Sequence, residues 1–206
     1  MVVFDGLGGW ATARLGGRDE RGDLQLAIDA HEQETPELPE IELAASLPKG
    51  DRLGTMLDMA TQLGISRFTP LKCDFSVISL DRKRQDPTER WTRIMLEACK
   101  QSRRATLPEI GSEATPSSVI ERASNEGAIV LVGDASAPPP SGVVEDASRI
   151  VIVVGPEGGF SPSEQAMLAG AETEERVRRI SIGRGVLRVE TAAAGMIAAA
   201  RAFARP

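Results

Sequence analysis

The stretch Val154–Glu164 reads VGPEGGFSPSE and directly follows the apolar run Arg149–Val153, RIVIV. The β-branched run predicts a buried strand, and Ser161, followed by Pro162 and by Glu164 three places on, predicts the capping box that begins a helix. Three glycines lie between the two elements, more than a tight turn needs. At the carboxyl end of a parallel strand, backbone without side chains lets a ligand reach main-chain N–H and C=O groups, so we expect a ligand-binding loop here.

The composition of this loop narrows the ligand. It is neither the G-x-G-x-x-G of dinucleotide sites nor the G-x-x-x-x-G-K-[ST] of triphosphate sites. A neutral or cationic adenosine compound, held by main-chain hydrogen bonds, suits a loop that carries Glu157 and no lysine.

From Lys49 onward the sequence alternates helix and strand patterns. Apolar residues recur at helical spacing over 53–63, and Asp86, Pro87 and Glu89 predict the capped start of a second helix. Thr115-Pro116 predicts the start of a third helix, and the Ala-rich segment 190–205 is a further one. Four strands are predicted between the helices: ISRFTPL, AIVLV, RIVIVV and VRRISI. This alternation predicts an α/β fold with a parallel sheet covered by helices on both faces.

The first forty residues are different, because three β patterns (VVFDG, WATARL and DLQLAI) follow one another with turn residues between them. They are too few for a closed barrel, and the chain opens in mid-pattern. We therefore expect part of a small N-terminal β-domain at 1–45, with the first strands missing, and a second domain at 46–206.

Composition excludes several kinds of site. The one histidine, His31, lies in an acidic, Pro-containing stretch, which argues against a Ser-His-Asp triad and an imidazole zinc site; Cys73 and Cys99 form no C-x-x-C pair, so we expect no metal. No signal peptide or membrane span is expected, which predicts a cytoplasmic protein. The net charge is −6, yet Arg82–Arg104 and Arg176–Arg188 are locally basic and could be either solvated faces or a nucleic-acid surface.

Two longer segments make the sequence recognisable: IVIVVGPEGGFSPSE, and ISIGRGVLRVETAAAGMIAAARAF after it. Together with SLPKGDRLGTMLDMATQLGISRFTPL and ERWTRIMLEACKQSRRATLPEI upstream, they strongly resemble the RsmE family of 16S ribosomal RNA uridine N3-methyltransferases, within the SPOUT superfamily. The resemblance covers about Leu47 to the C-terminus.

The resemblance implies a SPOUT-type parallel sheet whose C-terminal segment forms a trefoil knot, preceded by a PUA-like β-barrel that binds RNA. It also implies S-adenosylmethionine as the cofactor, bound in the knot without a metal, and a homodimer that acts on 16S rRNA of the small ribosomal subunit. The residues that it implies as cofactor contacts come from three loops: Val132, Gly133, Val154, Gly155, Pro156, Glu157, Gly158, Ile182, Gly183 and Leu187.

Methylating N3 of uracil requires removal of a weakly acidic proton and stabilisation of the negative charge left on the ring. We expect Arg188 to supply the electrostatic role, with a salt bridge to Glu190 as its alternative, and Glu97 or Glu190 to be the base. The RNA-binding residues implied by the resemblance are Gln101, Arg103, Arg104 and Lys49.

Two other classes of function stay open at this point. A non-catalytic RNA-binding or ribosome-assembly protein would keep the fold and the basic surface but bind S-adenosylmethionine poorly. A metabolic enzyme would bind a different adenosine compound and ignore ribosomal RNA.

Overall fold

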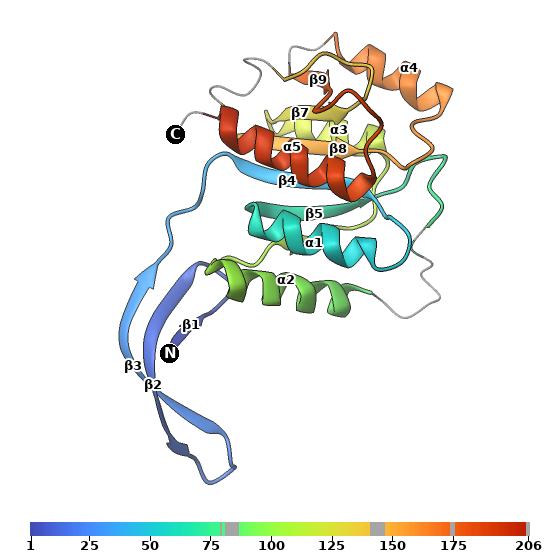
Figure 1. The fold of residues 1–206 in the computed structure, drawn as a ribbon. Helices are drawn as coiled ribbons and strands as arrows, with labels where there is room; N and C mark the ends of the chain where they lie inside the picture. The colour runs from blue at the N-terminus through green and yellow to red at the C-terminus, as the bar shows by residue number, and fades with distance from the viewer. Residues whose placement is uncertain (79, 81–86, 141–146, 174–175, 205–206) are drawn as a thin grey trace.

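The computed structural model describes residues 1–78, 80, 87–140, 147–173 and 176–204. The main body is a parallel sheet of six strands in the order β6-β5-β4-β8-β7-β9 (Figure 1). In chain order these strands are β4 (Glu40–Ser46), β5 (Ile65–Leu71), β6 (Glu109–Ile110), β7 (Ile129–Gly133), β8 (Arg149–Val154) and β9 (Val177–Ile180). The four strands predicted from the sequence are all present.

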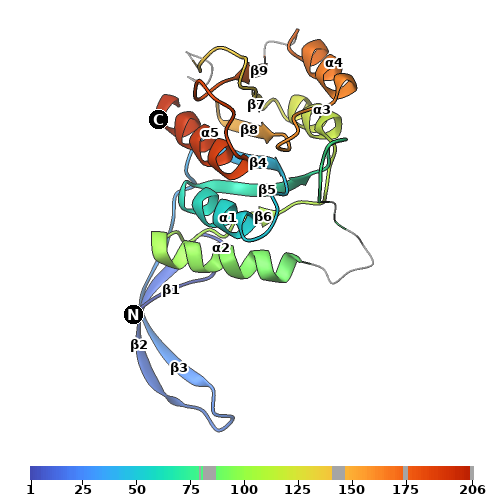
Figure 2. The ribbon, with the colours of Figure 1, turned by 45° about the vertical axis from the view of Figure 1, so that its right-hand side comes forward.

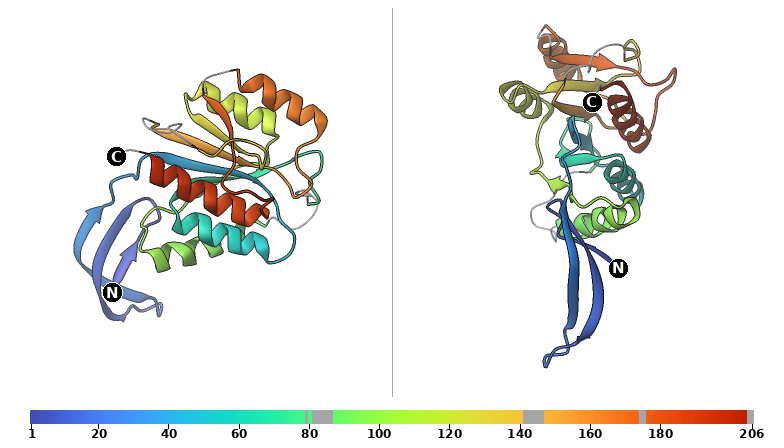
Figure 3. Two further views of the ribbon diagram at one scale, coloured as in Figure 1. Left: turned by 45° about the horizontal axis from the view of Figure 1, so that its top comes forward. Right: turned by 90° about the vertical axis from the view of Figure 1, so that its left-hand side faces the viewer.

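Helices cover both faces of this sheet, as the alternating pattern predicts (Figures 1 and 3). One face carries α1 (Arg52–Gln62), α2 (Thr88–Ser102) and α5 (Val189–Phe203), and the other carries α3 (Pro116–Asn125) and α4 (Pro162–Ala171). Strand β8 lies in the middle of the sheet and is buried on both sides except at its first residue, which explains its unbroken apolar run. Each face therefore has its own hydrophobic core.

Two helix starts agree with the sequence. In α4 the Ser161 hydroxyl accepts a hydrogen bond from the main-chain N–H of Glu164, and the Glu164 carboxylate accepts one from that of Ser161 at 2.8 Å. Helix α3 begins in the same way at Thr115. The predicted start of α2 differs, since Pro87 precedes the first helical residue and no side chain caps this end; Asp86 lies outside the described residues.

The N-terminal segment forms a separate antiparallel sheet of three strands, β1 (Val2–Phe4), β2 (Gly9–Arg18) and β3 (Leu24–Gln33) (Figure 2). It extends away from the main body, and all ten residues of β3 are exposed. The carboxylate of Glu34 joins the two parts by accepting hydrogen bonds from the main chain of Ala105 and the hydroxyl of Thr106, each at 3.1 Å.

The expected boundary between residues 45 and 46 falls inside β4, which belongs to the large sheet through pairing with β5 and β8. The change from one sheet to the other lies between Gln33 and Glu40. The sequence could not reveal this because EIELAAS is a strand pattern that continues the β-rich start of the chain.

Candidate functional site

A pocket of about 440 Å³ opens at the carboxyl ends of β7, β8 and β9. Three loops and the start of α5 enclose it, so residues far apart in the sequence meet there. This is the edge at which parallel α/β sheets bind ligands. All ten residues predicted as cofactor contacts line it: Val132, Gly133, Val154, Gly155, Pro156, Glu157, Gly158, Ile182, Gly183 and Leu187.

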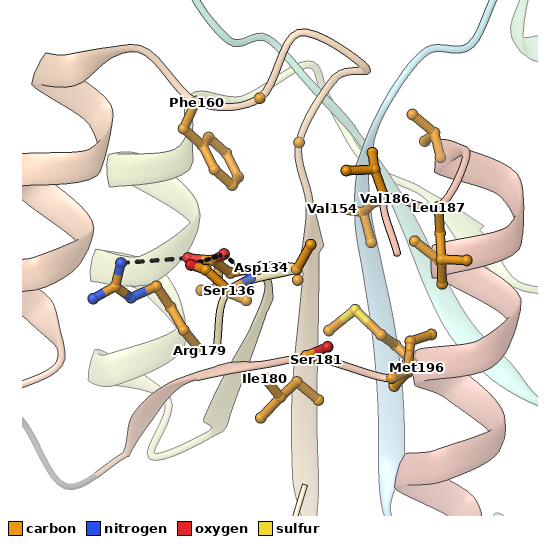
Figure 4. Close-up of a pocket in the computed structure, with 18 of the residues that line it drawn as sticks. Asp134, Ser136, Val154, Phe160, Arg179, Ile180, Ser181, Val186, Leu187 and Met196 are labelled. Atoms are coloured by element: carbon orange, nitrogen blue, oxygen red, sulfur yellow. Dashed lines mark hydrogen bonds and ion pairs between the residues drawn. The ribbon is translucent and has the colours of Figure 1, made fainter. Parts of the chain in front are cut away.

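The glycine loop after β8 is shaped by close approach to an aromatic ring. A Cβ atom at Gly155 would lie only 2.8 Å from Cζ of Phe160, whose side chain also lines the pocket (Figure 4). Gly159 has φ +74°, the left-handed region that favours glycine. One glycine therefore makes room for Phe160 and another permits the turn into Ser161, where α4 is capped.

Polar side chains gather at one end of the pocket (Figure 4). Arg179 donates to Glu172 and lies 3.4 Å from Asp134, and Ser136 donates to Asp134 through both its hydroxyl and its main-chain N–H. Burial alone would raise the pKa of Asp134, but these hydrogen bonds and the charge of Arg179 outweigh it and lower that pKa. The hydrogen bond from Arg179 likewise lowers the pKa of Glu172. This end of the pocket thus carries ionised carboxylate.

Arg52, at the start of α1, joins the glycine loop to α5. Its Nη1 atom lies 2.9 Å from Oε1 of Glu157 and 3.8 Å from Oε2 of Glu190. Glu190 is only 7% exposed, and its Oε2 is buried with no hydrogen bond to any described residue. Burying a carboxylate oxygen without a hydrogen bond costs free energy of folding, so Oε2 of Glu190 is an unused hydrogen-bond acceptor next to the pocket-lining Val189.

The predicted catalytic residues are divided between two places. Arg188 and Glu190 lie at the start of α5, next to the pocket-lining Leu187 and Val189. Arg188 is exposed, and no ion pair to it occurs within the part of the chain that the structure describes, so the alternative of a bridge to Glu190 is not formed. Glu97 instead lies exposed on α2, paired with Lys100 at 2.6 Å, and does not line the pocket.

The predicted RNA-binding residues are divided in a similar way. Lys49 is exposed in the turn after β4, at the carboxyl edge of the sheet, while Gln101 and Arg103 are exposed at the far end of α2. Arg104 donates to the main-chain oxygens of Thr61 and Ile65, the latter being the first residue of β5. Arg104 therefore lies at the amino edge of the sheet, and neither it nor the other predicted residues of α2 line the pocket of their own chain.

Some pocket residues were missed from the sequence: Asp134, Ser136, Phe160, Arg179 and Met196. Asp134 follows a buried strand directly, and a polar residue at the carboxyl end of a parallel strand was the available signal. Nothing in the sequence indicates that Met196 contacts a ligand, because an apolar residue at helical spacing is usually part of the hydrophobic core.

Two further properties of the described residues bear on chemistry. No group of three or more His, Cys, Asp and Glu side chains among them is arranged to hold a metal ion, and both cysteines are buried free thiols. In the same residues, no helix has the length and apolar character needed to span a bilayer.

The fold and the pocket together define an α/β protein with a ligand site at the carboxyl edge of a parallel sheet. Residues 36–201 match the family profile of the RNA methyltransferase domain. Two relatives, the ribosomal RNA small subunit methyltransferases E of Mycobacterium bovis and Rickettsia conorii, are each 30% identical to it. The alignments cover 94% of this chain and 74% of the first relative, and 98% and 80% for the second. The chain belongs to the RsmE family.

A solved relative agrees with this assignment. The crystal structure of ribosomal RNA small subunit methyltransferase E from Neisseria gonorrhoeae, bound to S-adenosyl methionine, superposes with a TM-score of 0.84 at 25% identity. The superposition covers 98% of this chain and 82% of that chain. The three-stranded N-terminal sheet and the six-stranded parallel sheet are thus included in one shared architecture.

Proposed function

We propose that this protein is an S-adenosylmethionine-dependent methyltransferase of small-subunit ribosomal RNA, and that it methylates N3 of a uridine in 16S rRNA. The observation that carries the proposal is the meeting of all ten predicted cofactor residues in one pocket at the carboxyl edge of the sheet. The relatives named above act, by their names, on ribosomal RNA of the small subunit, and one was crystallised with the cofactor.

The pocket fits S-adenosylmethionine in size and in chemistry. A volume of about 440 Å³ lies in the range of pockets that enclose small-molecule ligands. Apolar side chains such as Leu187 and Met196 suit the adenine ring, and glycine backbone on two walls leaves N–H and C=O groups accessible. The ionised Asp134 suits the cationic ammonium group. When bound, the cofactor supplies a methyl group on a positively charged sulfur, a reactive centre that needs no metal.

We assign the catalytic roles as follows. Arg188 stabilises the negative charge that appears on the uracil oxygens when N3 loses its proton, since it is exposed between the pocket-lining Leu187 and Val189 and has no ion pair among the described residues. Glu190 accepts the proton, because its Oε2 has no hydrogen-bond donor among the described residues and its neighbour Val189 lines the pocket. Glu97 is the weaker candidate for the base, being exposed, paired with Lys100 and toward the opposite edge.

We further propose that the N-terminal sheet is part of a PUA-like RNA-binding domain and that the segment from β8 to α5 forms the trefoil knot of SPOUT proteins. In support of the knot, the chain returns from the edge strand β9 to the middle of the sheet, where α5 packs on β4, β8 and α1 (Figure 1). A homodimer that works in the cytoplasm belongs to the same proposal.

The test is calorimetric titration with S-adenosylmethionine, followed in the same sample by methyl transfer to small ribosomal subunits that lack the modification. We expect binding, and transfer to N3 of a uridine. The Arg188→Ala variant should bind the cofactor as the wild type does and lose transfer. A wild-type protein that binds no S-adenosylmethionine would contradict the proposal, and binding without transfer would place the defect in RNA recognition.

A further inference from the structure

Arg52 is a charged residue close to the pocket to which the proposed mechanism gives no role. It lies in the first turn of α1, whose other residues in that turn carry no acid. Its side chain is about two-thirds buried and reaches two carboxylates from different elements through a single nitrogen atom. It therefore lies between the glycine loop and the start of α5.

The first of these carboxylates belongs to the glycine loop. Glu157 lines the pocket and has Pro156 and Gly158 as neighbours, so few side chains in this loop can anchor it to the body of the protein. The main-chain turn from Pro156 to Gly159 closes the loop on itself rather than onto α1 or α5. The contact of 2.9 Å between Arg52 and Glu157 links this pocket wall to the start of α1.

The second carboxylate is Glu190, which is nearly fully buried at the start of α5. Arg52 is the cation paired with it in the described part of the chain, at 3.8 Å and without a hydrogen bond. The separation is too long for a hydrogen bond, so the two groups are neighbours of opposite charge rather than hydrogen-bonded partners. Arg52 thus orients Glu190 without occupying its free oxygen.

We propose that Arg52 is a positioning residue that fastens the cofactor loop through Glu157 and at the same time orients Glu190 toward the substrate. The inference rests on the proposed function and deepens it. One side chain then supports both cofactor binding and proton removal. Loss of Arg52 loosens the loop that binds the cofactor and leaves Glu190, the proton acceptor, misplaced. Both effects follow from one guanidinium, so they are expected together.

The chain offers a matched control in Arg149. It pairs with Glu126 at 2.8 Å and is as exposed as Arg52, 35% against 32% for the side chains, but it lies at the amino edge of the sheet. Both variants are compared well below their thermal midpoints, because Arg52→Gln leaves the nearly buried Glu190 without its paired cation and so costs more stability than Arg149→Gln. A difference between the two variants in cofactor binding or in catalysis is then due to the place of Arg52 beside the pocket and not to a loss of folded protein.

The experiment measures the dissociation constant of S-adenosylmethionine, and kcat and KM for undermethylated small subunits, on both variants, on Glu157→Gln and on the double variant Arg52→Gln/Glu157→Gln. We expect Arg52→Gln to weaken cofactor binding about two- to fivefold and to lower kcat by about 10- to 100-fold with KM for the RNA little changed. Glu157→Gln should weaken cofactor binding to a similar degree, and the double variant no further, since the two residues act through one contact. Arg52→Lys should recover part of kcat, because it keeps the charge without the fork.

Values for Arg52→Gln that match those of Arg149→Gln would overturn the inference, as would additive losses of cofactor affinity in the double variant. If Arg52→Gln fails to fold, Glu157→Gln decides: unchanged cofactor affinity in that variant overturns the role of the contact. The proposed function is judged separately on the wild-type protein, which fails that test if it does not bind the cofactor.

Discussion

Replacing Gly155 by alanine tests whether the shape of the glycine loop sets cofactor affinity. The added Cβ would lie 2.8, 3.0 and 3.1 Å from three ring carbons of Phe160, whereas carbon atoms in contact are normally about 3.5–4.0 Å apart. The ring must therefore move by about 0.5–1 Å, and overpacking of this kind typically costs about 1–3 kcal/mol. Since Phe160 lines the pocket, a bound ligand restricts that movement and the cost falls largely on binding.

A cost of about 1–3 kcal/mol corresponds to cofactor binding about 5- to 150-fold weaker, measured by calorimetry with S-adenosylmethionine. Gly170→Ala is the matched control, because it makes the same chemical change in α4, where nothing lies within 4 Å of the new Cβ. That variant should keep wild-type affinity and gain up to about 1 kcal/mol in the free energy of unfolding. If Gly155→Ala bound the cofactor as tightly as the wild type, the close approach to Phe160 would have no part in affinity, and the reasoning would be refuted.

Three further outcomes follow from the described contacts. Arg104→Ala should lower the free energy of unfolding by about 1–3 kcal/mol in urea titrations, because two main-chain carbonyls lose their donor; an unchanged stability together with lost methyl transfer would instead favour the RNA-binding role. The pKa values of Asp134 and Glu172 are lowered in the folded protein, so their contribution to stability is present above about pH 4 and is lost as the pH falls below it; Arg179→Leu should reduce this acid dependence of the unfolding midpoint, and an identical pH profile would count against it. Burial raises the pKa of the Cys73 thiol to about 11, so alkylation at pH 8 should be more than about 100-fold slower in the folded than in the unfolded protein, and rapid labelling of the native chain would show that the thiol is accessible and ionised.

Local signals in the sequence were sufficient for most of the helices and strands. Ser161 and Glu164 predicted the start of α4 correctly, because a capping box depends only on residues three apart. The order of the strands in the sheet could not be predicted in this way, since pairing of β4 with β8 depends on contacts across more than a hundred residues. Because local sequence does not show which strands pair, residues 40–45 of β4 were placed in the N-terminal domain.

The part of the pocket wall that is made of glycine backbone was predictable from the sequence. The part that is made of side chains common elsewhere in a protein was much less predictable. Gly155 and Gly158 are unusual at the end of an apolar strand, so they predict a loop that binds a ligand through its backbone. Arg52 and Arg179 carry no such mark, because an arginine near the start of a helix or within a short strand is usually solvated. Arg104 is a different case, because the resemblance predicts an RNA contact for it and its guanidinium donates to main-chain oxygens of α1 and β5. The contact with RNA stays a prediction.

The pocket has a consequence for how the protein is made. Its lining begins at Val132 and continues to Met196 in α5, and α5 in turn packs on α1 and β4 from the first third of the chain. Synthesis proceeds from the N-terminus, so a nascent chain that has not yet released α5 from the ribosome lacks one wall of the site. Such a chain has no place for S-adenosylmethionine, and the cofactor can stabilise only a protein whose last helix has already folded back onto its first.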